Sequence, residues 1–160
     1  MQTVEELFDD VPALAALGPA HRATIAGCGR NRVFAPGARI IREGDPADEF
    51  FVIRRGAVAV EAEVPGRGAV TLQTLHDGEL LGWSWLVPPY RSAWNARSLA
   101  ATHVVALDGA CLREKCAADP ALGYDLLRLL AAVYVGRLQE TRLRLLDLYG
   151  SVHGGPLDRG

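Results

Sequence analysis

Between residues 32 and 108 the chain alternates between short apolar segments and turns, and this pattern constrains the fold more than any other feature of the sequence. Apolar or alternating runs occur at 39–41, 50–53, 58–64, 70–75 and 103–107. Turn sequences rich in Gly, Pro and Asp separate them, at 36–37, 44–46, 56, 65–68 and 77–78. Short strands at regular spacing with tight turns are typical of an antiparallel barrel or sandwich. We therefore predict an antiparallel, jelly-roll-like β-roll (a double-stranded β-helix) of roughly eight strands over residues 32–108.

The segment 58–64 shows the clearest two-residue alternation in this region. Glu61 and Glu63 fall on the opposite face from the apolar residues of the segment, as in a strand with one apolar face. Residues 65–68 then have the composition of a hairpin loop, which would join this strand to the run at 70–75.

Helical periodicity replaces the strand pattern on both sides of the β-roll. Residues 4–31 carry apolar side chains at helix-like intervals, and Gly18-Pro19 divides them into two pieces. Towards the C-terminus, Asp119-Pro120 is a helix start signal, a capping residue followed by proline in the first turn, and Gly150 is a stop signal. The expected organisation is a single domain over residues 1–150, with N-terminal helices at 4–31, the β-roll at 32–108, C-terminal helices at 109–150 and a flexible tail at 151–160.

The last predicted helix is long, about 30 residues or roughly 45 Å at 1.5 Å per residue. A small barrel covers only part of such a helix, so we expect the rest to pack against a second copy and form a homodimer. The alternative is a helix that folds back entirely on its own domain. The apolar seam behind both interpretations follows alternating three- and four-residue steps and comprises Leu127, Leu130, Tyr134, Leu138, Thr141, Leu145 and Leu148.

Charge and cysteine content narrow the class of protein. Lys plus Arg number 17 and Asp plus Glu 19, a net charge of −2, so the overall charge does not favour nucleic acid or an anionic membrane as a partner. The first residues are acidic and no apolar run approaches the roughly 18 residues that cross a bilayer. Cys28, Cys111 and Cys116 form no CxxC pair and are expected to be buried thiols of a cytoplasmic protein.

No motif of an enzyme or a metal site stands out. The four histidines and three cysteines lack metal-ligand spacing, so no metal is expected. A nucleophile elbow, a Walker loop and a dinucleotide-binding glycine motif are all absent from the sequence. We expect no catalytic residues and no bound cofactor.

Residues 78–94 interrupt the strand pattern with an apolar, helix-like turn, two prolines and then Arg91-Ser92-Ala93. The planar guanidinium of Arg91 can donate two parallel hydrogen bonds to a phosphate, and the Ser92 hydroxyl can donate a third. The small side chain of Ala93 lets the backbone approach a ligand closely. These residues indicate an anion-binding turn, with a structural salt bridge or an ordinary surface loop as the alternative.

At this point the sequence resembles the cyclic nucleotide-binding domains, typified by the catabolite activator protein and the regulatory subunits of protein kinase A. The resemblance runs from Leu7 to about Leu148. It includes residues 40–45 and 51–58, similar to the barrel signature with its two glycines, and Arg91-Ser92-Ala93, similar to the end of the phosphate-binding cassette. It implies that Arg91 and Ser92 hold a cyclic phosphate, and that the long helix is the dimerising helix of the family.

One departure concerns the ribose contact of that cassette, where the family has Gly-Glu. If Gly82 matches the family's glycine, Trp83 stands in the glutamate's place and cannot accept a hydrogen bond from a ribose hydroxyl. Aligning Gly78-Glu79 restores the pair but lengthens the segment before Arg91. We prefer the Gly82 alignment, in which Trp83 and Trp85 either stack on a flat ligand or fill the pocket.

The expected function is that of a stand-alone sensor module. It would bind a cyclic nucleotide such as cyclic AMP or cyclic GMP, or a related small phosphate ligand, and signal through the C-terminal helix to its dimer mate or to an unknown protein partner. The residues after Gly150 offer no recognition helix, so direct DNA binding is not expected. The alternative is a degenerate domain that binds no nucleotide and serves as a dimerisation or docking unit. The predicted ligand-binding residues are Gly82, Trp83, Ser84, Arg91, Ser92 and Ala93.

Overall fold

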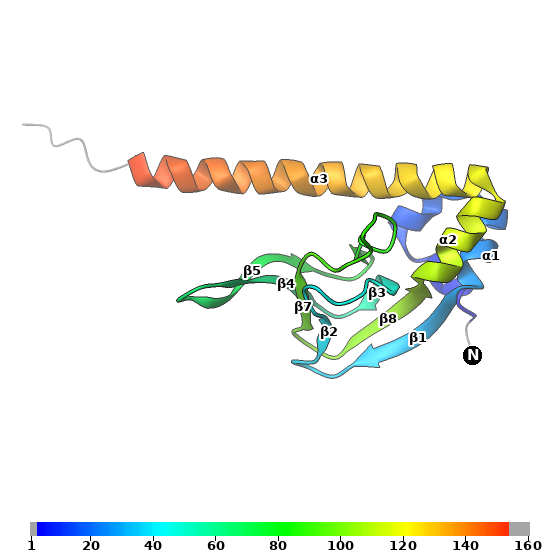
Figure 1. Ribbon diagram of the computed structural model, residues 1–160, viewed down its shortest axis with the longest axis horizontal. Coiled ribbons are helices and arrows are strands. Elements are labelled where there is room, and N and C mark those ends of the chain that lie inside the picture. Colours follow the sequence, from blue (N-terminus) through cyan, green and yellow to red (C-terminus); the bar gives the residue numbers. More distant parts are fainter. Residues whose placement is uncertain (1–2, 154–160) are drawn as a thin grey trace, which may run out of the picture.

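The computed structural model describes residues 3–153, which form short N-terminal helices, a β-roll and two C-terminal helices (Figure 1). The N-terminal helices are η1 (Glu6–Phe8), η2 (Pro12–Ala16) and α1 (Pro19–Ala26). The strands are β1 (Gly29–Phe34), β2 (Arg39–Ile41), β3 (Glu49–Arg55), β4 (Val58–Val64), β5 (Gly68–Leu75), β6 (Leu80–Leu81), β7 (Asn95–Ser98) and β8 (Thr102–Asp108). The C-terminal helices are α2 (Gly109–Ala118) and α3 (Pro120–His153).

The β-roll consists of two four-stranded sheets, with strand orders β1-β8-β3-β6 and β2-β7-β4-β5. All of the strand pairs within them are antiparallel. The predicted fold class, mainly β with flanking helices, is therefore confirmed. One boundary differs, because β1 begins at Gly29, inside the region predicted to be helical. A β-carbon at Gly29 would lie 2.9 Å from Val4 and 3.1 Å from Leu107, so the close packing of the N-terminal segment on β8 requires glycine there.

Two apolar clusters hold the molecule together. One lies between the sheets and is built on Phe51, Ile53 and Val104. The other joins the helices to the outer face of the first sheet, and includes Trp85, which is fully buried. Burial of a large aromatic side chain is one of the strongest single contributions to a core. Trp85 therefore packs in the core and is not available to stack on a ligand.

Cys28 and Cys111 form a disulfide, which corrects the prediction that all three cysteines are free thiols. Cys28 follows α1 and Cys111 begins α2, 83 residues later in the chain. The backbone brings them together, since the Asp108 amide donates to the Cys28 carbonyl at 2.9 Å. The spacing of the cysteines along the sequence contained no sign of this proximity. Cys116 is the free cysteine of the described chain, and burial raises the pKa of its thiol.

Helix α3 starts where the sequence predicts, with the Asp119 carboxylate accepting hydrogen bonds from the Ala121 and Leu122 amides at 3.1 and 3.4 Å. It continues to His153, past the predicted stop at Gly150, so the first residues of the predicted tail are helical. The remainder of that tail, 154–160, lies outside the described residues.

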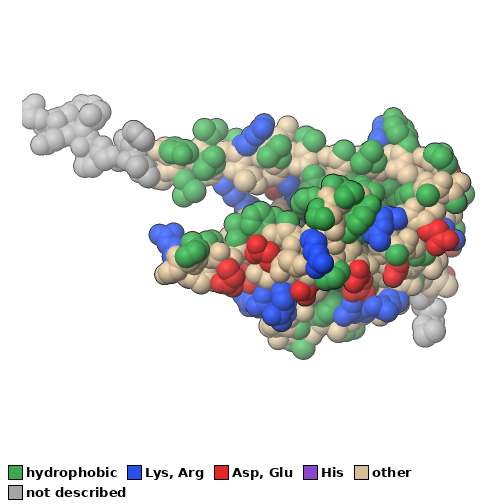
Figure 2. Space-filling model, in the orientation of Figure 1, with side chains coloured by type: hydrophobic (Ala, Val, Ile, Leu, Met, Phe, Trp, Pro, Cys, Tyr) green, Lys and Arg blue, Asp and Glu red, His purple; other side chains and the backbone are tan. Residues whose placement is uncertain are grey.

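The two ends of α3 differ in their surroundings. Its first turns are buried against α2 and the N-terminal helices through Leu122, Leu126 and Leu130. Its distal part extends beyond the β-roll, and Figure 2 shows an open wedge between it and the β4–β5 hairpin. The helix therefore does not fold back entirely on its own domain. None of the described helices is both long enough and apolar enough to cross a membrane.

Candidate functional site

A cavity of about 600 Å³ lies between the second sheet and α3. Its size falls within the range of small-molecule binding sites. The floor is apolar and comes from the β-roll, through Ile40, Ile41, Phe51, Val60, Leu75, Leu81 and Ala96. The other walls come from the segment 82–84, the segment 92–95, the loop at 45–49 and one face of α3.

The segment before β7 is held in place by the loop after β2. The Ser92 amide donates to the Asp45 carbonyl at 2.9 Å, and the Gly44 amide donates to the Ser92 carbonyl at 2.8 Å. One step further, the Ala47 amide donates to the Tyr90 carbonyl at 2.8 Å. This short ladder fixes which side chains of the predicted anion-binding turn face the cavity. Ser92 and Ala93 are among the lining residues.

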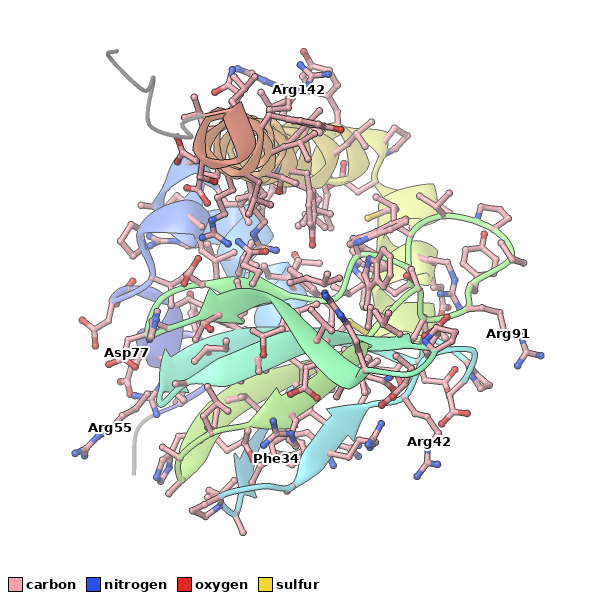
Figure 3. The ribbon with its side chains drawn as sticks, turned by 90° about the vertical axis from the view of Figure 1, so that its left-hand side faces the viewer. Phe34, Arg42, Arg55, Asp77, Arg91 and Arg142 are labelled. Atoms are coloured by element: carbon pink, nitrogen blue, oxygen red, sulfur yellow. A yellow bond between two sulfur atoms is a disulfide. The ribbon has the colours of Figure 1, made fainter. Side chains whose placement is uncertain are left out.

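Arg91 lies outside the cavity, unlike the other five predicted ligand-binding residues, which line it. The four residues after Arg91, Ser92 to Asn95, all line the cavity, so this wall begins immediately after Arg91. The Arg91 side chain is exposed and donates a hydrogen bond to the Gly44 carbonyl at 3.1 Å. Figure 3 shows it pointing away from the molecule.

The structure distinguishes between the two alignments of the cassette. Gly82 lines the cavity with φ of +88°, a conformation that favours glycine, and Trp83 and Ser84 follow it along the wall. Glu79 is not among the lining residues, and its carboxylate accepts a hydrogen bond from the His76 amide at 2.7 Å. The Gly82 alignment is thus the one that places the cassette on the cavity, and the carboxylate of Glu79 is engaged in a turn instead.

The remaining wall comes from four residues of α3: Tyr134, Arg137, Leu138 and Thr141. The sequence pattern placed three of them on the predicted dimer seam and gave no sign of Arg137. The rings of Tyr134 and Trp83 meet edge to face, with centroids 6.3 Å apart. The Arg137 guanidinium lies 5.1 Å from the centre of the Tyr134 ring and donates a hydrogen bond to the Leu80 carbonyl. The sequence signal that could have found this wall is the spacing of its residues by three or four positions, which places them on one face of a helix.

Burial raises the pKa of the Tyr134 phenol, and the positive charge of Arg137 partly opposes this effect. The hydroxyl is therefore protonated at neutral pH and can donate a hydrogen bond. It is buried, and its polar neighbour is the Arg137 guanidinium, which lies close enough to lower the pKa but makes no hydrogen bond of good geometry to it within the described chain.

The tryptophans divide between core and cavity. Trp83 and Trp94 are 39% and 45% exposed and line the cavity, whereas Trp85 packs on Phe50 with ring centroids 5.7 Å apart. Trp83 and Trp94 therefore offer aromatic surface to a ligand. For Trp83 this agrees with the interpretation that it stacks on a flat ligand. Trp85, packed in the core, anchors the segment 82–84 that precedes it.

Arg97 and Glu61 lie on the outer face of the second sheet and pair with each other. Glu61 is on the face expected from the alternation of β4 but is only 3% exposed, because Arg97 covers it. The pair raises the pKa of Arg97, first through the hydrogen bond and then through the charge of Glu61. Arg97 thus has the paired role that suits a sheet surface rather than a ligand site.

A β-roll whose cavity is closed by a C-terminal helix defines a class of small-molecule-binding regulatory domains. The family model described as cyclic nucleotide-binding domain matches residues 31–119, more than half of the chain. The chain belongs to this family.

Relatives of known sequence and structure agree with this assignment. A cAMP-dependent protein kinase regulatory subunit of Schizosaccharomyces pombe is 35% identical over 78 residues, which are 49% of this chain and 18% of that protein. The chain thus spans less than a fifth of that curated relative. A cyclic nucleotide-binding protein from Geobacter metallireducens superposes with a TM-score of 0.76 at 28% identity, covering 86% of this chain and 99% of that one. A cyclic nucleotide-binding domain from Methylobacillus flagellatus superposes with a TM-score of 0.81 at 18% identity, over 98% and 90% of the two chains.

Proposed function

We propose that this domain is a sensor that binds a cyclic nucleotide or a related phosphate ligand in the cavity and signals its occupancy through α3. The observation that carries the proposal is that α3 supplies one wall of the cavity, while its distal part extends beyond the domain. A ligand in the cavity therefore contacts α3, and the distal part of α3 is accessible to other molecules.

The phosphate would sit near Ser92, where the cassette and the loop at 45–47 meet. Ser92 offers a hydroxyl there, and Gly82 lets the backbone approach without a side chain in the way. Arg91 is tied to the protein by one hydrogen bond, to the Gly44 carbonyl, so a rotation of its exposed side chain is compatible with the fold. Binding of a charged phosphate would repay the loss of this bond, because charge-assisted hydrogen bonds are stronger than neutral ones.

Signalling requires a ligand that binds one arrangement of α3 more tightly than another. Tyr134 and Leu138 line the cavity, so the position of α3 changes the shape of the binding site. Ligand occupancy would then shift the population of helix positions, and no further relay is needed.

Titration with cyclic AMP and cyclic GMP, followed by tryptophan fluorescence and calorimetry, tests this proposal. Trp83 and Trp94 at the cavity are expected to report saturable binding, and Arg91→Ala to weaken it by at least tenfold. Arg55→Ala is the matched control, because Arg55 is exposed and points away from the cavity (Figure 3). The absence of any response at millimolar nucleotide contradicts the proposal.

A homodimer through α3 is the second part of the proposal. In its distal part, which contacts the β-roll where Arg144 donates to the Leu72 carbonyl at 3.3 Å, the helix exposes a row of leucines that a monomer leaves in water: Leu143 at 62%, Leu145 at 52%, Leu146 at 64% and Leu148 at 65%. Exposed apolar surface of this kind marks interaction sites. Light scattering at micromolar concentration should give a dimer, and Leu143→Glu together with Leu146→Glu should give a monomer.

The alternative function, a docking unit that binds no nucleotide, is favoured by two observations. In the Gly82 alignment Trp83 stands where the family has its ribose-binding glutamate, and Arg91 points out of the cavity. This alternative predicts a dimer whose melting temperature does not change with nucleotide, so a thermal shift of several degrees would reject it.

A cytoplasmic location stays a prediction, and the Cys28–Cys111 pair provides a test of it. A reducing compartment keeps such thiols free. Thiol trapping in intact cells should therefore find both cysteines reduced, and a disulfide already present in the cell would contradict the prediction.

A further inference from the structure

Three arginines lie at or next to the cavity, and they point in different directions. Arg42 is 67% exposed, approaches Asp45 at 4.0 Å, and points into solvent as Arg91 does (Figure 3). Arg137 comes from α3, is partly buried, and lines the cavity under the helix. Among the described residues, the cationic group most enclosed by the cavity therefore belongs to the helix and not to the cassette.

The surroundings of Arg137 leave binding capacity unused. One of its nitrogens donates to the Leu80 carbonyl, whereas a guanidinium has five N–H donors. Beside it lies the buried Tyr134 hydroxyl, which has no hydrogen-bond partner in the described chain. A buried polar group without a partner is unfavourable by itself, and a bound acceptor would satisfy it.

The carboxylates at the cavity do not neutralise this site. Glu49 is held by Arg30 at 2.7 Å and by Arg32 at 2.5 Å. Asp45 and Asp48 also line the cavity; both are exposed, Asp45 with 61% of its side chain accessible, so water screens their charges. An anion in the cavity would therefore meet the charge of Arg137 with little opposition from the acids.

The rest of the cavity suits a flat and largely apolar body. Trp83 meets the edge of Tyr134, and Trp94 lies half-exposed on the lining. The floor between them consists of aliphatic side chains and Phe51. Aromatic and aliphatic walls with a few placed polar groups are typical of small-molecule sites, where the polar groups fix the orientation of the ligand.

We propose, building on the ligand-binding role proposed above, that Arg137 and Tyr134 of α3 bind an anionic group of the ligand from the helix side of the cavity, in addition to the phosphate contacts proposed for Ser92 and Arg91. The ligand class is a flat molecule with a carboxylate, phosphate or sulfonate group. Arg137 also ties α3 to the β-roll through the Leu80 carbonyl, so an anion that takes over its guanidinium alters a contact between helix and barrel. Anion binding and the position of α3 are coupled through this one side chain.

A matched pair of dyes tests the inference on the full chain. The anionic dye 8-anilinonaphthalene-1-sulfonate and the neutral N-phenyl-1-naphthylamine share a flat apolar body and differ in the sulfonate. The wild-type protein is expected to bind the anionic dye about 10- to 100-fold more tightly than the neutral one. Arg137→Gln, which keeps a hydrogen-bond donor but removes the charge, should abolish this preference, and Arg55→Gln, at an exposed residue that points away from the cavity, should keep it.

Two cavity-filling variants locate the dyes. Ala96→Leu fills the floor and Thr141→Trp fills the exposed rim of the α3 wall, so both should weaken the binding of both dyes. If circular dichroism shows that Ala96→Leu does not fold, Thr141→Trp still provides the cavity-filling control.

The outcomes separate the two proposals. If the dyes occupy the cavity but Arg137→Gln keeps the anionic preference, the assignment to Arg137 is overturned and the sensor function stands. If neither filling variant weakens dye binding, the cavity is not a ligand site and the sensor function is overturned with it. Loss of the preference in Arg137→Gln alone supports the assignment.

Discussion

The cassette and the α3 wall face each other across one cavity, and they contribute different chemistry. The cassette, residues 82–84 and 92–94, supplies small residues, a serine hydroxyl and two tryptophans, while its arginine points to solvent. The α3 wall supplies Arg137 and the unpartnered hydroxyl of Tyr134. In this chain the most enclosed positive charge at the cavity therefore comes from the helix and not from the cassette.

The largest expected effect concerns how the cassette is anchored. Trp85→Ala removes a fully buried side chain that packs on Phe50, and should lower the free energy of unfolding by about 3–5 kcal/mol. Trp83→Ala is the matched control, since Trp83 is 39% exposed, and should lower it by less than about 1 kcal/mol. Urea unfolding monitored by circular dichroism measures both. Similar losses for the two variants would contradict the division of the tryptophans into core and cavity.

The second prediction concerns the two ends of α3. Leu126→Ala at its buried end should destabilise the domain by about 2–4 kcal/mol, because Leu126 is 1% exposed in the helical cluster. Leu146→Ala at the distal end, where the side chain is 64% exposed, should change the stability of the monomer by about 0.5 kcal/mol or less. Unfolding should be measured at protein concentrations below the dissociation constant of the dimer, so that both variants are compared as monomers. An equal loss at both ends would show that the distal helix packs on its own domain.

The third and smallest prediction compares glycines from the two walls. Gly82→Ala places a side chain at φ of +88° and should destabilise the domain by about 1–2 kcal/mol. Gly136→Ala lies inside α3 with no neighbour within 4 Å of the added carbon, so it should stabilise the domain by up to about 1 kcal/mol. Thermal melts of the two variants should therefore shift in opposite directions. A stable Gly82→Ala protein would contradict the special conformation of the cassette.

Local signals explain what the sequence predicted well. The strand runs and their glycine turns, and the Asp119-Pro120 helix start, depend on residues close together in the chain. The position of Gly82 and Trp83 on the cavity wall agrees with the preferred alignment, which stays a prediction.

Features that depend on contacts between distant segments were not predictable in this way. Arg91 points outwards because its backbone pairs with residues 44–47, and no local pattern contains that register. The Cys28–Cys111 disulfide joins segments 83 residues apart. Arg137 reaches the cavity only because the fold brings α3 across the second sheet. Its sequence surroundings are those of any helix with an apolar seam.

The central claim is that ligand occupancy of the cavity acts on α3, and hydrogen exchange tests it most directly. Amide exchange of residues 134–141 should be measured with and without millimolar cyclic AMP, in the wild-type protein and in Arg137→Gln. The account predicts slower exchange along this face of α3 with ligand in the wild-type protein, and a smaller change in the variant. If calorimetry shows that the ligand binds but amide exchange in α3 does not change, the account is contradicted.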